Sequence, residues 1–351
     1  MPRKPARSPK PRAGATSKTI NLGLQGGGAH GAFTWGVLDR LFEDGRLDVE
    51  GIVGTSAGAM NAAAVASGFH CGGKEGARER LNAFWQATSK AARSGPLQPS
   101  PLDRWLGTGN LDFSPTWHLF DSLSRVVSPY QSNPLNINPL RDILADICDL
   151  DAMRAADSVK LFLCATNVRT GRIKVFQGKE LSIDAVLASA CLPFIYQAVE
   201  IDGEHYWDGG YMGNPPIFPL IYDTDCRDVL IIQINPINVP AVPKTAQEIF
   251  DRINTLSFNS SLMREMRAVD FVTKLIDQGT LDSKSYKRLN VHAIDAEAEM
   301  ARLSVSSKLN ADAGFLSTLF DLGRERATHW LESNFDKVGV ESSVDIEARF
   351  L

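Results

Sequence analysis

Long apolar runs are missing from this chain of 351 residues, since no stretch of about 18 consecutive apolar residues occurs in it. A membrane-spanning helix is therefore not expected. Cysteine is scarce and odd in number, and its five positions are scattered. This usage argues against a disulfide framework and predicts reduced thiols in a cytoplasmic protein. Neither the cysteines nor the six histidines have the spacing of metal ligands, so we expect no metal and no other cofactor.

Acidic residues are absent from residues 1–18, which contain six basic residues and four prolines. Since the whole chain has a net charge of −4, the remainder carries −10. The composition predicts a disordered basic tail. The alternative is attraction of this tail to anionic lipid, which would give a peripheral contact at the inner membrane surface. The acidic remainder contains no recognised nucleic-acid module, so we expect no nucleic-acid partner.

Glycine is concentrated in two turns near the start, Gly26-Gly27-Gly28-Ala29-His30-Gly31 and Gly54-Thr55-Ser56-Ala57-Gly58. Each turn follows a β-branched or aliphatic segment and precedes a helical pattern, so each is predicted to join a strand to a helix. The predicted strands are residues 19–24 and 51–53, and the predicted helices are 32–42 and 57–67, the second ending at Gly68. A Gly-x-Ser-x-Gly turn of this kind exposes its serine on a strained backbone, which makes Ser56 a candidate nucleophile. The alternative is a tight turn in which Ser56 only caps the helix.

The first turn also fits the dinucleotide-binding fingerprint Gly-x-Gly-x-x-Gly, with Asp48 or Glu50 as the ribose-binding acid. In that fold the acid lies at the carboxyl end of the second strand. Here both acids precede Ile52 and Val53, and Ser56 follows the strand instead. We therefore favour the other role for the first turn, in which its amides donate hydrogen bonds to the oxyanion of an acyl intermediate.

A serine nucleophile needs a base. A triad in the chain order of hydrolases would use a late histidine, either His292 or His329, but neither has a recognisable local setting. Asp208 is better placed, because it ends a predicted hairpin over residues 198–207 and is followed by Gly209 and Gly210. The alternative for Asp208 is a turn aspartate that binds only its own backbone.

Together with residues 161–168, residues 188–194 and Asn214-Pro215-Pro216, these three motifs resemble the patatin-like phospholipases over residues 20–220. The resemblance implies a lipid acyl hydrolase with a Ser56–Asp208 dyad, no catalytic histidine and an acyl lipid substrate. It assigns the oxyanion turn to Gly26, Gly27 and Gly28, and it places the supporting motif at His30, Gly31, Gly54, Gly58, Gly209 and Gly210. The family usually has Arg or Lys where this chain has His30, and a neutral imidazole would weaken the positive charge there. An acyltransferase or a non-catalytic lipid-binding regulator on the same scaffold is the alternative function.

Strands that alternate with helices predict a three-layer α/β/α sandwich around a mainly parallel central sheet. The expected catalytic domain covers residues 19–235, and a helical C-terminal extension covers 236–351, with helices over 246–277 and 313–334. These helices could pack on the sheet, form a dimer contact or act as a lid. Residues 69–140 form an irregular insertion rich in proline and tryptophan. We expect it to line an acyl-chain channel or to meet a lipid surface through Trp105, Phe113, Trp117, Leu119 and Phe120.

Overall fold

The computed structural model describes residues 17–155 and 159–351, which form one eight-stranded sheet in the order β5-β6-β3-β2-β1-β7-β8, with β4 beside β3. Five neighbouring strands are parallel and three are antiparallel at one edge, so the predicted mainly parallel sheet is confirmed. The parallel strands are β1 (Lys18–Leu24), β2 (Leu47–Thr55), β3 (Lys160–Asn167), β7 (Asp228–Ile232) and β8 (Asn290–Ile294). The antiparallel strands are β4 (Ile173–Gln177), β5 (Val199–Ile201) and β6 (Glu204–Asp208).

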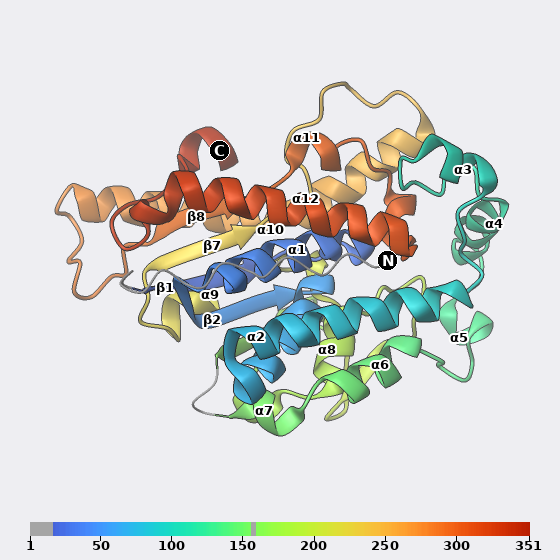
Figure 1. The fold of residues 1–351 in the computed structure, drawn as a ribbon, viewed down its shortest axis with the longest axis horizontal. Helices are drawn as coiled ribbons and strands as arrows, with labels where there is room; N and C mark the ends of the chain where they lie inside the picture. The colour runs from blue at the N-terminus through green and yellow to red at the C-terminus, as the bar shows by residue number, and fades with distance from the viewer. Residues whose placement is uncertain (1–16, 156–158) are drawn as a thin grey trace, which may run out of the picture.

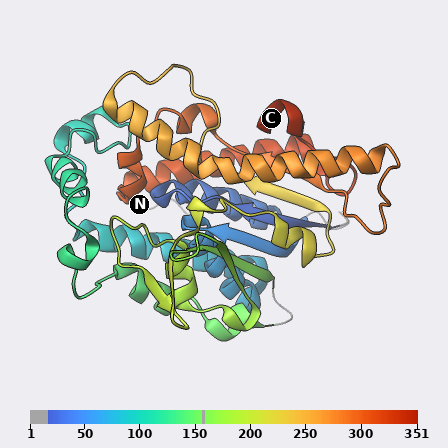
Figure 2. The ribbon, with the colours of Figure 1, turned by 180° about the vertical axis from the view of Figure 1, so that it is seen from behind.

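Helices cover both faces of the sheet, which gives the expected three layers (Figures 1 and 2). One face packs against α1 (Gly31–Asp44), α2 (Ala57–Arg93), α6 (Pro139–Ile147), α8 (Ile183–Ser189) and α12 (Ala313–Asn334). The other face packs against α9 (Phe218–Tyr222), α10 (Ala246–Asp277) and α13 (Ile346–Phe350). Short helices α7 (Leu150–Arg154) and α11 (Glu297–Met300) connect these elements.

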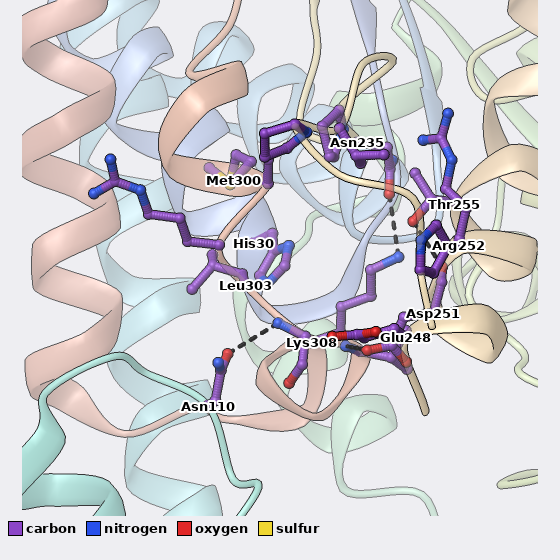
Figure 3. A pocket seen from close by; sticks show the side chains of 18 of the residues that line it. His30, Asn110, Asn235, Glu248, Asp251, Arg252, Thr255, Met300, Leu303 and Lys308 are labelled. Atoms are coloured by element: carbon purple, nitrogen blue, oxygen red, sulfur yellow. Dashed lines mark hydrogen bonds between the residues drawn. The ribbon is translucent and has the colours of Figure 1, made fainter. Parts of the chain in front are cut away.

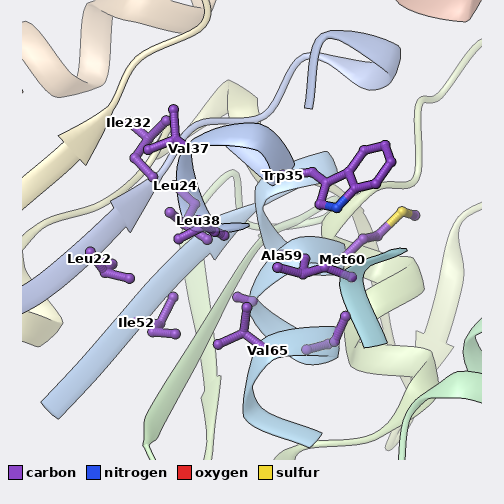
Figure 4. Packing of buried hydrophobic residues seen from close by; sticks show 14 of the residues in the cluster. Leu22, Leu24, Trp35, Val37, Leu38, Ile52, Ala59, Met60, Val65 and Ile232 are labelled. Atoms are coloured by element: carbon purple, nitrogen blue, oxygen red, sulfur yellow. The ribbon is translucent and has the colours of Figure 1, made fainter. Parts of the chain in front are cut away.

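The core follows the alternation of side chains along each strand. Leu22, Ile52 and Ile232 belong to the cluster beneath α1 and α2, where Leu38 and Val65 meet them (Figure 4). Their strand neighbours, such as Val53 and Ile231, point to the opposite face and pack on α9, α10 and α13. Strands buried on both faces explain why these segments are almost continuously aliphatic.

The predicted irregular insertion over residues 69–140 is wrong, because most of it is helical. Helix α2 does not end at Gly68 but continues to Arg93 through a kink at Gly72 and Gly73. Helices α3 (Pro101–Leu106), α4 (Pro115–Ser124), α5 (Pro129–Ser132) and α6 follow. Each of these four begins with a proline at its first position, after a serine or asparagine at the N-cap. Proline is tolerated there because the first helical amide needs no partner inside the helix, so the prolines mark helix starts.

The C-terminal part contains more than helices. The two predicted long helices coincide with α10 and α12, but β8 lies between them and pairs in parallel with β7. At the other end of the chain, Lys18 begins β1, so it is not part of a tail. Ser17 precedes this strand, and residues 1–16 of the predicted tail lie outside the described residues. Within the described ranges, none of the helices has the length and apolarity to cross a membrane.

Candidate active site

Ser56 lies at the carboxyl end of β2, in the turn that leads into α2, as the sequence predicts. Its φ of 55° and ψ of −123° fall outside the usual regions for a residue with a side chain. Strain of this kind costs about 1–3 kcal/mol and is found where the surrounding structure enforces it. Here the enforcement comes from backbone packing at Gly58, where a Cβ atom would lie 2.2 Å from the Leu24 carbonyl oxygen, and at Gly54, where it would lie 2.5 Å from the Gly58 carbonyl oxygen.

The first glycine turn packs directly against the second. A Cβ atom on Gly26 would lie 2.5 Å from Ser56 Cβ, so glycine is needed there for close approach. The Gly26 amide donates to Asn214 Oδ1 at 2.6 Å and is therefore not free to face an oxyanion, which corrects its predicted role. The amides of Gly27, Gly28 and Ala29 have no hydrogen-bond partner among the described residues. Gly28 and Ala29 also line the same cavity as Ser56.

The register of the sheet brings Asp208 to Ser56. Thr55 pairs with Cys164 on β3, and the next β3 residue, Ala165, pairs with Asp208 at the end of β6. Gly209 then crosses β3 so closely that a Cβ atom would lie 2.2 Å from the Cys164 carbonyl oxygen. The predicted hairpin that positions Asp208 is therefore present as β5 and β6.

Asp208 is fully buried, and its two carboxylate oxygens differ. Oδ1 accepts a 2.7 Å hydrogen bond from the Gly210 amide, whereas Oδ2 has no partner of standard geometry within the described residues. Burial raises the pKa of Asp208 to about 6, while hydrogen bonding from Ser56, the Gly210 amide and the charge of Lys308 oppose the rise. The Ser56 hydroxyl is thus near enough to influence the carboxylate, and hydrogen bonds of this kind often tighten only when substrate binds.

An apolar cavity of about 350 Å³ opens at Ser56. Its walls come from α2, α4, α6 and the segment after α8, and they include Met60, Phe84, Trp85, Leu97, Phe120, Leu140, Ile143, Leu192 and Ile195. Of the aromatic residues expected to contact lipid, Phe120 lines this cavity and Trp117 is buried beside it. Trp105, Phe113 and Leu119 are exposed at the surface instead.

A second cavity of about 420 Å³, more polar than the first, is lined by His30 of the first glycine turn and by Asn235, Asp251 and Lys308 (Figure 3). Lys308 lines both cavities, and His30 lines the polar one. His30 is buried, with its Nε2 2.7 Å from Ser307 Oγ. Burial and the Lys308 charge lower the pKa of His30 to about 3, so the imidazole is neutral at physiological pH.

The histidines of the alternative triad lie elsewhere. His292 is in β8, three strands from β2, which corresponds to roughly 14 Å at the usual strand spacing. Its ring nitrogens contact Asp228 Oδ1 at 3.0 Å and Ser343 Oγ at 2.9 Å, and these contacts attach the C-terminal segment to the sheet. His329 is exposed on α12.

The acids of the dinucleotide alternative are also misplaced. Asp48 and Glu50 lie at the beginning of β2, whereas Ser56 follows the end of the same strand. Asp48 forms an ion pair with Lys74, and Glu50 forms one with Lys160. The structure therefore contradicts the ribose-binding role. In the described ranges, no group of three or more His, Cys, Asp or Glu side chains could hold a metal ion.

Four residues that sequence reasoning did not assign support the turns. Ser189 Oγ accepts a 3.0 Å hydrogen bond from the Ser56 amide, and Asn214 Oδ1 accepts one from the Gly26 amide. Both lie in the blocks that carry the family resemblance, so that signal could have found them. Asn235 donates to the Gly26 carbonyl oxygen at 2.8 Å, and Lys308 donates in turn to Asn235 Oδ1 at 3.1 Å. Lys308 had no motif around it that could have indicated this position.

Residues 22–221 match the family model of the patatin-like phospholipases, and the chain belongs to this family. Its members are lipid acyl hydrolases, the class of enzyme that matches this fold and this pair of turns.

Two solved structures are similar to the chain. The crystal structure of VipD from Legionella pneumophila has a TM-score of 0.44 and 16% identity, with 90% of this chain and 67% of VipD covered. The heterodimeric complex ExoU–SpcU from the type III secretion system of Pseudomonas aeruginosa has a TM-score of 0.36 and 16% identity. That match covers 92% of this chain and 53% of the other, so this chain spans about half the length of its counterpart in the complex. No curated protein matches the sequence significantly.

Proposed function

We propose that the chain is a serine esterase that cleaves carboxylic ester bonds of phospholipids or related acyl lipids, with Ser56 as nucleophile and Asp208 as base. The observation that carries the proposal is a serine on a strained turn, beside a buried carboxylate, at the floor of an apolar cavity. A carboxyl group with a pKa of about 6 is mostly ionised at pH 7 and is more basic than an exposed aspartate.

The reaction proceeds through an acyl-enzyme. Asp208 accepts the Ser56 proton while Ser56 Oγ attacks the ester carbonyl carbon, and the negative charge moves to the carbonyl oxygen. The unpaired amides of Gly28 and Ala29 line the cavity at this point and are suited to donate to that oxygen, with Gly27 beside them. The tetrahedral intermediate expels the alcohol, which takes the proton from Asp208. Water then attacks the acyl-enzyme with Asp208 again as base, and the fatty acid leaves.

The substrate is inferred from the walls of the cavity. Aliphatic and aromatic side chains surround Ser56, so the acyl chain of the ester would occupy this space and the head group would lie outside it. We propose phospholipase A or lysophospholipase activity on this basis, in a cytoplasmic protein that contacts the membrane surface only peripherally.

The test is hydrolysis of p-nitrophenyl esters of graded chain length and of phospholipid vesicles. We expect Ser56→Ala to abolish hydrolysis, and Asp208→Asn to reduce kcat by at least about 100-fold. Ser89→Ala removes a buried hydroxyl that belongs to the same helix but does not line the cavity, and Asp202→Asn changes an exposed turn of the same hairpin. Both controls should keep full activity. Hydrolysis by a correctly folded Ser56→Ala variant would contradict the proposal.

The same incubations separate the related functions. Transfer of the acyl group to an added alcohol in preference to water would identify an acyltransferase. Lipid binding without any hydrolysis by the wild-type protein would identify a binding protein, and the dyad would then have no catalytic role.

A further inference from the structure

Lys308 reaches the active-site turn from the C-terminal part of the chain. It lies in the short helix η4 (Val305–Leu309), whose carbonyl oxygen at Lys308 would be 2.2 Å from a Cβ atom on Gly28. Gly28 also has a φ of +61°, so the turn and η4 can adopt this contact only because position 28 is glycine. The neighbouring Ser307 contacts the same turn through its side chain, with its Oγ 2.7 Å from His30 Nε2. Helix η4 is therefore packed on the turn that is suited to hold the oxyanion.

The Lys308 ammonium group is held by neutral oxygens. Its Nζ donates to Asn235 Oδ1 at 3.1 Å (Figure 3) and to Asn254 Oδ1 at 3.1 Å. Asn235 in turn donates to the Gly26 carbonyl oxygen. An ammonium group has three N–H donors, so one remains unassigned by these contacts. No carboxylate within the described ranges forms an ion pair with Lys308, and its positive charge therefore acts on its surroundings without a direct counterion.

The titratable groups that face Lys308 come from three elements. Burial lowers the pKa of Lys308 to about 8, and the charges of Asp251 on α10 and of Asp208 at the end of β6 oppose this fall. The third group is His30, which is neutral because its own pKa is lowered by burial and by Lys308. Lysine 308 is thus protonated at pH 7, and it supplies the positive charge at a turn whose own side chain, His30, carries none.

We infer that Lys308 is a positioning residue of the esterase, which keeps Asp208 ionised through its charge and fixes the Gly26–Gly28 turn through Asn235. The C-terminal segment is then an integral part of the active site. This inference rests on the proposed function, because its effect is exerted on the Ser56–Asp208 pair. Lys308 also lines the cavity at Ser56 together with Gly28 and Ala29, so its charge favours the oxyanion of the transition state as well as the ionised base.

The test is the pH profile of kcat/KM for a soluble p-nitrophenyl ester between pH 5 and 9.5, read at the isosbestic wavelength of nitrophenol. We expect the wild type to have an acidic limb near pH 6 and an alkaline limb near pH 8, from Asp208 and Lys308 respectively. Lys308→Met should lose about tenfold in kcat/KM at the optimum and should lack the alkaline limb. Its acidic limb should move up by about one pH unit, which gives a further loss of about fivefold at pH 6.

Lys308→Arg is the matched variant, because guanidinium stays charged throughout this range. It should retain most of the activity and also lack the alkaline limb. This result would hold even if Lys308→Met failed to fold, which thermal unfolding would reveal. Profiles of wild type, Lys308→Met and Lys308→Arg that share the same two limbs would overturn the inference.

The failure of the proposed function has a different signature. Ser56→Ala should abolish hydrolysis and also the labelling of the protein by a fluorophosphonate. If Ser56→Ala is inactive but the Lys308 variants leave the profile unchanged, only the inference about Lys308 fails. If wild type shows neither hydrolysis nor labelling, the proposed function fails and the inference fails with it.

Discussion

At the scale of single residues, Asp208 combines two properties that usually conflict. It is fully buried, and yet in the proposed mechanism it has to be ionised to accept a proton from Ser56. Burial disfavours the charged form, and only the Gly210 amide, Ser56 and Lys308 act in the opposite direction. The protein therefore loses stability at neutral pH in order to keep a carboxylate in the site, as active-site residues commonly require.

This loss should be measurable. The folded pKa of Asp208 is about 6 and the ordinary value is 3.8, so the ionised group destabilises the folded state above pH 6 and not below pH 4. Asp208→Asn should therefore raise the free energy of unfolding by about 3 kcal/mol at pH 7.5, and the gain should vanish as the pH falls from 6 to 4. Thermal unfolding at several pH values measures this difference. The exposed control Asp202→Asn should show no such dependence, and parallel curves for Asp208→Asn and wild type would contradict the expected pKa.

At the scale of elements, the contact between α1 and α12 joins the catalytic half of the chain to the C-terminal half. The two helices touch through glycines, since a Cβ atom on Gly36 would lie 1.9 Å from the Phe320 carbonyl oxygen, and one on Gly323 would lie 2.2 Å from the Phe33 carbonyl oxygen. Helix α1 also carries the first glycine turn at its beginning.

Gly36→Ala tests this contact. In an isolated helix the change would stabilise by about 1 kcal/mol, because alanine is the better helix former. Here we expect the opposite, a destabilisation of about 3 kcal/mol in urea unfolding, because the obstacle is backbone and cannot rotate away. Gly314→Ala on α12 meets only the Asp312 side chain and should be neutral or stabilising. Equal effects of the two substitutions would mean that the helices do not approach so closely in solution.

The same elements show what sequence can and cannot predict. The bounds of α10 and α12 followed from apolar periodicity, and the strand–turn–helix junctions followed from glycine next to aliphatic runs, because these signals are local. The prediction of an irregular insertion is wrong because its prolines do not interrupt helices: Pro101, Pro115, Pro129 and Pro139 each begin a helix after a capping residue.

At the candidate active site, residues in local sequence motifs could be predicted, whereas residues that arrive from distant parts of the chain could not. Ser56 and Asp208 lie in glycine-rich motifs, so both could be proposed as site residues from their neighbours in the sequence. The use of the Gly26 amide by Asn214 and the approach of Lys308 to Gly28 depend on residues 188 and 280 positions apart in the chain. Contacts of this kind are set by tertiary packing and leave no local pattern.

At the scale of the whole molecule, the site and the insertion share one end. The parallel strands point towards the end of the sheet where α3, α4 and α5 lie, whereas α9 lies at the other end (Figures 1 and 2). Helix α4 divides its apolar residues between two environments: Trp117 and Phe120 face inwards, and Leu119 and Leu123 are exposed. Other exposed apolar side chains of this insertion are Leu102, Trp105, Leu106, Phe113, Val126, Tyr130, Leu135 and Ile137. So many exposed apolar side chains on one insertion favour contact with a lipid surface beside the cavity.

Trp105, which is 80% exposed, is the side chain with which to test this contact. If α3 enters a lipid surface, Trp105→Ser should weaken binding to phospholipid vesicles by about 30-fold, because burial of a large apolar side chain contributes about 2 kcal/mol. Hydrolysis of vesicles should fall in parallel, whereas hydrolysis of a soluble short-chain ester should not change, since Trp105 does not line the cavity at Ser56. Tyr222→Ser is the matched control, because Tyr222 is 78% exposed on α9 at the opposite end of the sheet. Vesicle flotation and the ratio of the two hydrolysis rates measure the outcome. Equal losses for Trp105→Ser and Tyr222→Ser, or a loss on the soluble ester, would show that the molecule does not approach lipid with this end.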